Sequence, residues 1–390
     1  MTVGDPAHGI IKFAVPLILG YILQQMYLIV DAAIVGRWIG VDALAAVGAS
    51  ASVMFLVMGF CNGACAGFAI PIARAFGAKD FKKMRVYVAN SIRVALVLII
   101  VSTFLSCVLC GRILRLVNTP REIFDDAYTF LLLQFLAIPF TLTFNLFAGY
   151  IRALGHSRQP FVFLILSSFV NILLDILLIL MLGMGVAGAG LATLLSQLFA
   201  SVLSVWYVAR HMKILIPHGD ERAFDNKRIS ILLNNGIPMG LQVSITAIGV
   251  IMLQSSNNAL GTVYVASFTA AVRIKYLFIC VFDNIGVAMA TYCGQNIGAG
   301  RLDRVRQGEW AAMKIMMVYF VFTALVIFPF AGYIMELIVD GGSQAVSDNA
   351  AMLMRISCFF YPVLGLLSIL RYSIQGLGYS NLSMLSGVME

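Results

Sequence analysis

The chain has 390 residues, of which 61% are hydrophobic and only 11% are charged. Soluble domains run about 45–50% apolar and about 25% charged, so this composition excludes a single water-soluble domain and indicates a polytopic membrane protein. The formal net charge is +8. The basic residues follow the expected membrane topology, and we expect no nucleic-acid partner.

Apolar segments long enough to cross a bilayer recur along the whole chain. A spanning helix needs roughly 20 mostly apolar residues. By that criterion we expect ten spans, near residues 10–35, 43–70, 87–110, 127–151, 160–182, 186–209, 230–256, 262–293, 310–338 and 349–375. A further apolar segment begins at residue 380 and reaches the end of the sequence at residue 390.

The second half of the sequence repeats the first. GAKDFKKMR at 77–85 is echoed by GAGRLDRVR at 298–306, and IRALGHS at 151–157 by IQGLGYS at 374–380. Both pairs are separated by nearly the same length of chain, so the echo keeps its register over a long distance. Duplicated membrane bundles that rock against each other around a shared site are the usual architecture of a transporter.

The repeat predicts two lobes joined by a linker. We expect an N-lobe with helices 1–6 over residues 1–215, a cytoplasmic linker over 216–228, and a C-lobe over 229–390. Six spans are an even number, so both lobes should share one orientation and be related by an axis along the membrane normal. By the repeat offset the C-lobe should hold helices 7–10 and the start of helix 11, and so be incomplete.

Basic residues indicate which way the chain crosses the membrane. With the N-terminus in the cytoplasm, 16 lysine and arginine residues fall at cytoplasmic ends of the spans and 4 fall at the opposite ends. Cytoplasmic loops carry an excess of such residues. We therefore expect a multi-pass protein of the cell membrane with a cytoplasmic N-terminus.

Carboxyl groups inside the spans are the main candidates for function, because a charged group at mid-bilayer costs at least about 2.5–3.5 kcal/mol. Asp31 lies in the first span, with Gln24 and Tyr27 at helical spacing before it. Asp175 lies in the fifth span, and Asn171 shares its face one turn earlier. Carboxylates with neutral oxygen ligands suit either a proton or a sodium ion.

Other polar residues of the spans have simpler interpretations beside the functional one. Asn171, Thr193 and Gln197 could serve only to join helices by hydrogen bonds. Asp31 would be merely interfacial if it lay nearer the membrane boundary. Further charges in the spans stand at Arg273, Lys275, Asp283 and Arg371. The first two are explained equally well by side chains that reach the interface, and Asp283 has no partner that the sequence identifies.

Seven cysteines lie mostly within apolar segments. Cys61 and Cys65, like Cys107 and Cys110, have helical spacing. No histidine or carboxylate cluster joins them, so we interpret them as small buried hydrophobic residues and expect no metal site there.

Several of these stretches resemble the multidrug and toxic compound extrusion (MATE) transporters, whose superfamily also holds lipid-precursor flippases. The stretches, found in this order, are VDAAIVGRWIGVDALAAVG (30–48), FGAKD (76–80), IRALGHSRQP (151–160), NILLD (171–175), GVAGAGLATLLSQ (185–197) and GQNIGAG (294–300). The resemblance implies an all-α fold of twelve helices in two six-helix lobes with a central cavity. The pattern is most similar to the branch often called DinF-like.

The resemblance also implies residue roles. Asp31, Asn171, Asp175 and Thr193 match the cation site of the N-lobe, where Na⁺ could bind to Asp31, Asn171 and Asp175. We expect substrate contacts from a second set of residues: Gln24, Tyr27, Asn145 and Gln197. Some members carry an acidic residue in helix seven, whereas this chain has Gln242, Ser244 and Thr246 there and no carboxylate.

The function expected from the sequence is antiport. A monomer would export cationic amphipathic small molecules across the lipid bilayer in exchange for H⁺ or Na⁺, with no cofactor and no enzymatic activity. The alternative is a flippase for lipid-linked precursors, which would need arginine or lysine in its cavity to hold a pyrophosphate. The candidates for that role are Arg93, Arg273, Lys275 and Arg371.

Overall fold

The computed structural model describes residues 1–117, 119–338 and 344–389, so residue 390 of the last expected segment lies outside it. This part of the chain is helical and contains no strand. Its α-helices are α1 (Pro6–Trp38), α2 (Val41–Gly77), α3 (Phe81–Leu116), α4 (Phe124–Ala153), α5 (Arg158–Asp175), α6 (Gly185–His211), α7 (Asn226–Asn258), α8 (Thr262–Gly298), α9 (Leu302–Ile338), α10 (Gln344–Phe359), α11 (Tyr361–Gly376) and α12 (Ser380–Met389). Short helices are η1 (Arg121–Ile123), η2 (Ile176–Met181), η3 (Lys213–Leu215) and η4 (Gly219–Arg222).

Nine helices of the described part are long and apolar enough to cross a membrane, and a tenth span is possible if α10 and α11 are counted as one. These two helices are bent by 50° at their junction. Pro362 stands in the first turn of α11, where a missing N–H is tolerated. Pro139 at the matching place of the first repeat lies inside the continuous helix α4, so proline alone does not account for the break. The prediction of an all-α polytopic membrane protein is confirmed, but the expected span over 349–375 is two helices.

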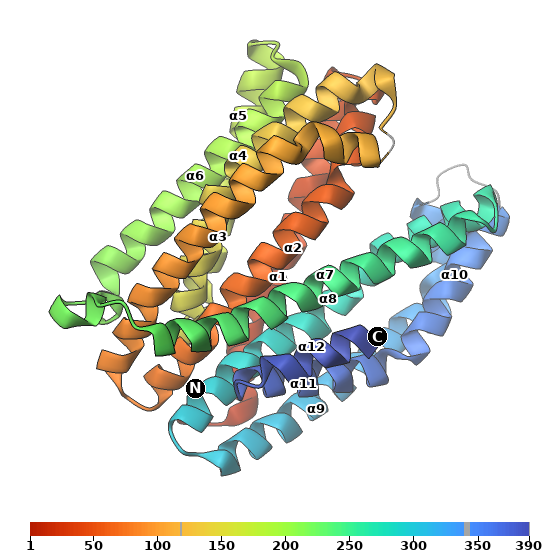
Figure 1. Ribbon diagram of the computed structural model, residues 1–390. Coiled ribbons are helices and arrows are strands. Elements are labelled where there is room, and N and C mark those ends of the chain that lie inside the picture. The colour runs from red at the N-terminus through yellow and green to blue at the C-terminus, as the bar shows by residue number, and fades with distance from the viewer. Residues whose placement is uncertain (118, 339–343, 390) are drawn as a thin grey trace.

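The helices form two bundles that diverge as the arms of a V (Figure 1). The first bundle is α2–α6, and a large apolar cluster joins its helices. The second bundle is α8–α12, and a second apolar cluster packs α8, α9, α10 and α11 together. α1 and α7, the first helix of each repeat, lie between the two.

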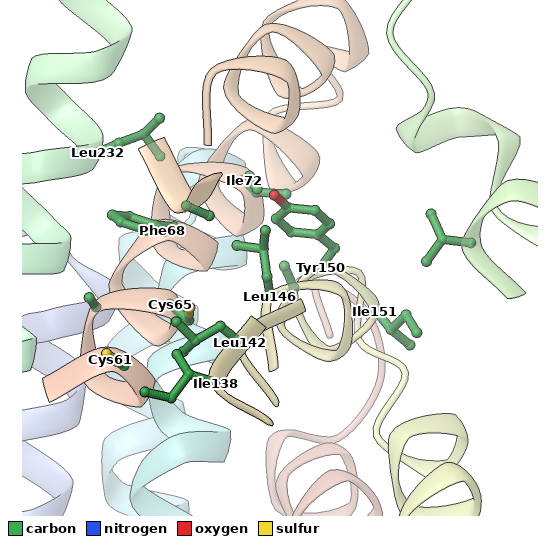
Figure 2. Packing of buried hydrophobic residues seen from close by; sticks show 14 of the residues in the cluster. Cys61, Cys65, Phe68, Ile72, Ile138, Leu142, Leu146, Tyr150, Ile151 and Leu232 are labelled. Atoms are coloured by element: carbon green, nitrogen blue, oxygen red, sulfur yellow. The ribbon is translucent and has the colours of Figure 1, made fainter. Parts of the chain in front are cut away.

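Each of these first helices packs into the other repeat's bundle. Ile10 and Phe13 near the start of α1 are buried in the cluster of the second bundle. Leu232 near the start of α7 is buried in the cluster of the first bundle, where Figure 2 shows it beside Phe68 of α2. Ile10 and Leu232 occupy equivalent positions in the two repeats, so the exchange is reciprocal.

Glycines let α2 of the first bundle and α7 approach each other closely where they cross. Gly63 and Gly67 of α2 face backbone atoms of α7, and a Cβ atom at either would lie 2.5 or 2.6 Å from the carbonyl oxygen of Met239 or Asn235. Gly240 of α7 faces α2 in the same way. Small residues at helix crossings are typical of membrane bundles, because packing drives the association there.

The arms meet at one end of the molecule, which we call the closed end and define by the turns after α2 and α8. α2 ends at Gly77 and α8 at Gly298, and these glycines begin the two repeated stretches GAKDFKKMR and GAGRLDRVR. A Cβ atom on Gly77 would lie 1.9 Å from the carbonyl oxygen of Gln295, and one on Gly298 would lie 2.0 Å from that of Arg74. Arg74 and Gln295 stand equally far before these two glycines, so the contact is nearly symmetric.

The segment between α6 and α7 is fastened to α3 of the first bundle. Glu221 of η4 accepts hydrogen bonds of 2.6 and 2.7 Å from the guanidinium of Arg85. Arg93 donates to the carbonyl oxygens of Arg222 and Ala223. Glu221 is 8% exposed and ion-paired, although most of the segment's other residues are exposed.

Candidate cation site and central cavity

Two carboxyl groups from different helices meet inside the first bundle. Asp31 of α1 is 7% exposed and Asp175 at the end of α5 is fully buried. Their carboxyl groups lie within hydrogen-bonding reach of each other. The Oδ1 atom of each is buried and has no hydrogen-bond partner among the described residues.

An amide and a third helix complete the surroundings of Asp175. The amide of Asn171 donates to Oδ2 of Asp175 over 2.9 Å and accepts from the backbone N–H of Thr193 over 3.2 Å, in the orientation that satisfies both groups. The hydroxyl of Thr193 donates to Ala189 in its own helix over 3.1 Å. Thus all four residues of the expected cation site lie together, contributed by α1, α5 and α6.

Helix geometry changes at this site. α5 continues directly into η2, a π-helix over Ile176–Met181, so the widened turns begin immediately after Asp175. π-Helical turns are rare and are often found at functional sites. The uniformly apolar sequence of this segment gives no signal for the change.

The arrangement of the carboxyl groups restricts what the pair can bind. Two adjacent ionised carboxylates repel, so a buried pair requires a proton or a cation between them. The Oδ1 atoms of Asp31 and Asp175 are available acceptors. A hard cation such as Na⁺ is also bound through carboxylate and amide oxygens. The residues therefore fit either coupling ion.

The remaining candidates from the sequence lie in different surroundings. The hydroxyl of Tyr27, expected to contact substrate, is within hydrogen-bonding reach of Thr193 and so lies beside the candidate cation site. Gln24 and Asn145 line a cavity, and Asn145 also donates to Oδ1 of Asn62 over 2.8 Å. Gln197 is half-buried one turn after Thr193 and lines neither cavity described below.

Two neighbouring cavities lie close to these helices. The central cavity, about 260 Å³, is lined by α2 and α4 of the first bundle and by α7, α8 and α11 on the other side, with one residue of α1. The side cavity, about 210 Å³, is lined by α1, α4, α5 and one residue of α8. Leu17, Arg152 and Asn284 line both. Gln24 precedes Asp31 by seven residues, about 10 Å along a helix, so the side cavity lies near the carboxyl pair.

Arg152 and Asn284 were not expected from the sequence as cavity residues. Arg152 stands in the last turn of α4 and counted there only as a basic residue at the end of a span. The four basic residues considered for a flippase, Arg93, Arg273, Lys275 and Arg371, line neither cavity.

Residues of the second repeat do not reproduce the carboxyl pair among the described part of the chain. Gln242 of α7 is buried in a hydrogen-bonded cluster with Gln375 of α11 and Ser383 of α12, at distances of 2.7–3.1 Å. On α8, Arg273 and Asp283 are exposed and Lys275 is half-buried. The corresponding region is therefore polar but carries no paired acid.

A protein-family model and several known proteins match the sequence of this chain. The family model MatE matches residues 16–177 and 237–389. The chain is 29% identical to "Probable multidrug resistance protein YpnP" of Bacillus subtilis (strain 168) over 377 residues, which are 97% of this chain and 84% of that one. It is 20% identical to "Multidrug export protein MepA" of Staphylococcus aureus (strain bovine RF122 / ET3-1), covering 98% and 85% of the two chains.

A solved structure shows the same fold. "Outward-facing conformation of a multidrug resistance MATE family transporter of the MOP superfamily" superposes with a TM-score of 0.92 at 23% identity, covering 99% of this chain and 86% of that chain. Together with the match of the family model to both halves of the sequence, this shows that the chain is a multi-pass membrane protein belonging to the MatE family.

Proposed function

We propose that this protein is a secondary active antiporter that exports cationic amphipathic compounds in exchange for H⁺ or Na⁺. The buried pair of Asp31 and Asp175 carries the proposal, because a carboxyl pair inside an apolar bundle needs a proton or cation. The relatives named as multidrug resistance and export proteins support the substrate class.

The position of the pair suggests how ion and substrate exchange. Asp31 lies toward the end of α1, while the start of the same helix is buried in the second bundle. A change of charge at Asp31 therefore acts on a helix that contacts both bundles. Antiport requires that ion and substrate prefer different conformations, and each shifts the equilibrium only by its difference in affinity for the two.

The orientation follows from the basic residues. Arg74, Arg152 and Arg301 lie at the closed end, among most of the chain's other lysines and arginines. The positive-inside rule then puts the closed end and the N-terminus in the cytoplasm of a cell-membrane protein. In that orientation the arms of the V diverge toward the outside.

Uptake of a fluorescent cationic dye into everted membrane vesicles tests the proposal. We expect Asp31→Asn and Asp175→Asn to abolish transport, because each change replaces one of the two carboxyl groups. Asp126→Asn, at an exposed position in the first turn of α4, is the matched control and should transport as the wild type does.

Imposing a pH gradient and a sodium gradient separately identifies the coupling ion. Transport driven by the pH gradient alone assigns a proton to the pair, and transport driven only by sodium assigns Na⁺. Wild-type rates in both aspartate variants would refute the site. If neither gradient moves dye with the wild-type protein, drug antiport is refuted.

A further inference from the structure

Arg152 is the single charged residue in the linings of both cavities, as far as the structure describes them. It reaches the two cavities from α4 of the first bundle. Asn284 of α8 lines the same two spaces from the other bundle. The guanidinium therefore stands at the junction of the cavities and between the two bundles.

The guanidinium of Arg152 is not neutralised within the described part of the chain. No carboxylate lines either cavity. Arg85 pairs with Glu221 and Arg228 pairs with Asp225, and neither of these ion pairs involves Arg152. No described residue accepts a hydrogen bond from Arg152, although a guanidinium presents five donors in a rigid fork. Arg152 is half-buried. A cation that is partly withdrawn from water normally has an oppositely charged partner, so this one can accept an anionic group that the lining of the cavities does not supply.

A second unpartnered polar atom faces the central cavity from the other side. Gln375 of α11 is 2% exposed and lines this cavity. Its Nε2 atom donates to Gln242 and Ser383 over 2.9 and 2.7 Å. Its Oε1 atom is buried and has no hydrogen-bond partner in the described structure. The cavity thus offers a donor fork on one bundle and an acceptor on the other.

The topology alone does not account for Arg152. A basic side chain at the end of α4 is favoured by the helix dipole and by the positive-inside rule. Such a side chain ordinarily reaches toward water or the headgroups, as exposed Arg158 can at the start of α5. Arg152 instead faces the space between the bundles.

We infer that Arg152 binds a carboxylate or phosphate group of the transported molecule, while Gln375 accepts a hydrogen bond from its amine or amide. The inference rests on the proposed transport function and refines it. The preferred substrates would be zwitterionic amphipaths that carry a cationic and an anionic group, and not only permanent cations. Arginine suits this role because its fork matches both oxygens of a carboxylate, which lysine cannot do.

A matched pair of dyes isolates the anionic group. Rhodamine 110 carries a free carboxylate, and rhodamine 123 is its methyl ester with the same aromatic amines. We would measure initial uptake of both into proteoliposomes under the coupling gradient and compare their ratio. Arg152→Gln should lower the ratio of rhodamine 110 to rhodamine 123 about tenfold or more, because a charge-assisted hydrogen bond is lost. Arg152→Lys should give an intermediate ratio.

Controls separate recognition from folding. Arg158→Gln removes an exposed arginine at the same end of the molecule and should leave the ratio unchanged. Rhodamine 123 uptake by Arg152→Gln reports whether the variant is folded. Fluorescence anisotropy titration of both dyes with detergent-purified protein measures binding without transport, and should show the same selective loss.

Lipid composition distinguishes two sources of the anionic group. If an anionic headgroup occupies Arg152, adding phosphatidylglycerol to phosphatidylcholine vesicles should inhibit rhodamine 110 uptake by the wild type and not by Arg152→Gln. If the dye's own carboxylate binds there, uptake should be the same in both bilayers. Inhibition assigns the bound oxyanion to a headgroup, and equal uptake together with the selective loss in Arg152→Gln assigns it to the dye.

Other results would overturn the inference. They are an unchanged dye ratio in Arg152→Gln that still takes up rhodamine 123, an equal loss of affinity for both dyes in the binding titration, or a wild-type protein that carries rhodamine 123 and not rhodamine 110. Failure of the wild type to carry either dye would count against the proposed transport function instead. The binding titration would then still test Arg152.

Discussion

Replacing Gly77 by alanine should force the two bundles apart at the closed end. The added Cβ atom would lie 1.9 Å from the carbonyl oxygen of Gln295 and 2.6 Å from its carbonyl carbon, whereas real Cβ contacts essentially never fall below 3.0 Å. Both neighbours are backbone atoms and cannot rotate away. The helices must therefore separate by about 1 Å or more, since overpacked contacts relax by backbone shifts.

The size of the effect follows from the cost of overpacking. Such contacts typically cost about 1–3 kcal/mol, which corresponds to a shift of roughly 5- to 150-fold away from the closed arrangement. The direction of the change in stability is informative. Without a clash, alanine in a helix would stabilise the closed arrangement by about 1 kcal/mol relative to glycine. A conformation in which this end is separated should therefore gain population.

Distances between spin labels measure that population. Labels at the exposed positions Lys82 and Asp303 report on α3 and α9 at the closed end. We expect longer distances in Gly77→Ala than in the wild type, and the same in Gly298→Ala. Because both changes separate the same contact, the double variant should shift little more than the stronger single one.

A glycine in open space supplies the control. Gly249 of α7 has no atom within 4 Å of an added Cβ, so Gly249→Ala should keep the wild-type distances. If Gly77→Ala also kept them, or if the two closed-end variants shifted the equilibrium additively, the reciprocal glycine contact would not control closure.

Three further changes test contacts elsewhere, each by thermal unfolding of detergent-purified protein. Hydrogen bonds from Arg85 lower the pKa of Glu221 from 4.5 to about 2, so the stabilisation is fully present above pH 4.5 and is lost as pH falls through 2. Glu221→Gln should therefore cost about 1 kcal/mol at pH 7 and much less at pH 2. An equal cost at both pH values would exclude ionisation as the cause. Tyr150→Phe removes the buried 2.7 Å hydrogen bond to Ser91 and should cost about 1 kcal/mol, with the loss absent on a Ser91→Ala background. Asp80→Ala removes the N-cap of α3 and should cost about 1 kcal/mol, whereas Asp80→Asn should cost much less.

Hydropathy predicted the helices well because burial in a bilayer demands long apolar segments with internally satisfied backbones. It did not predict the break between α10 and α11. The segment is apolar on both sides of the junction, so its mean hydropathy gives no signal for the break. Similarly, nothing in the apolar run after Asp175 distinguishes a π-helix from an α-helix.

Helical spacing could place Asn171 on the same face as Asp175, but it could not show that α1 brings Asp31 to them. That step came from the family resemblance, since the choice of neighbouring helices depends on the whole bundle. Arg152 was missed for a related reason. The positive-inside rule is enough to explain a basic residue at the end of a helix. That Arg152 faces a cavity depends on how α4 is rotated against the second bundle, which only the structure shows.

The reciprocal burial of Ile10 and Leu232 bears on how the duplicated chain arose. Two separate half-length chains with this arrangement would form a symmetric parallel dimer in which each donates its first helix to the other's core, a domain swap. Fusing the halves through the segment that η4 fastens to α3 would turn that association into an intramolecular one. The starts of the exchanged helices would then act as the interface of an internal homodimer.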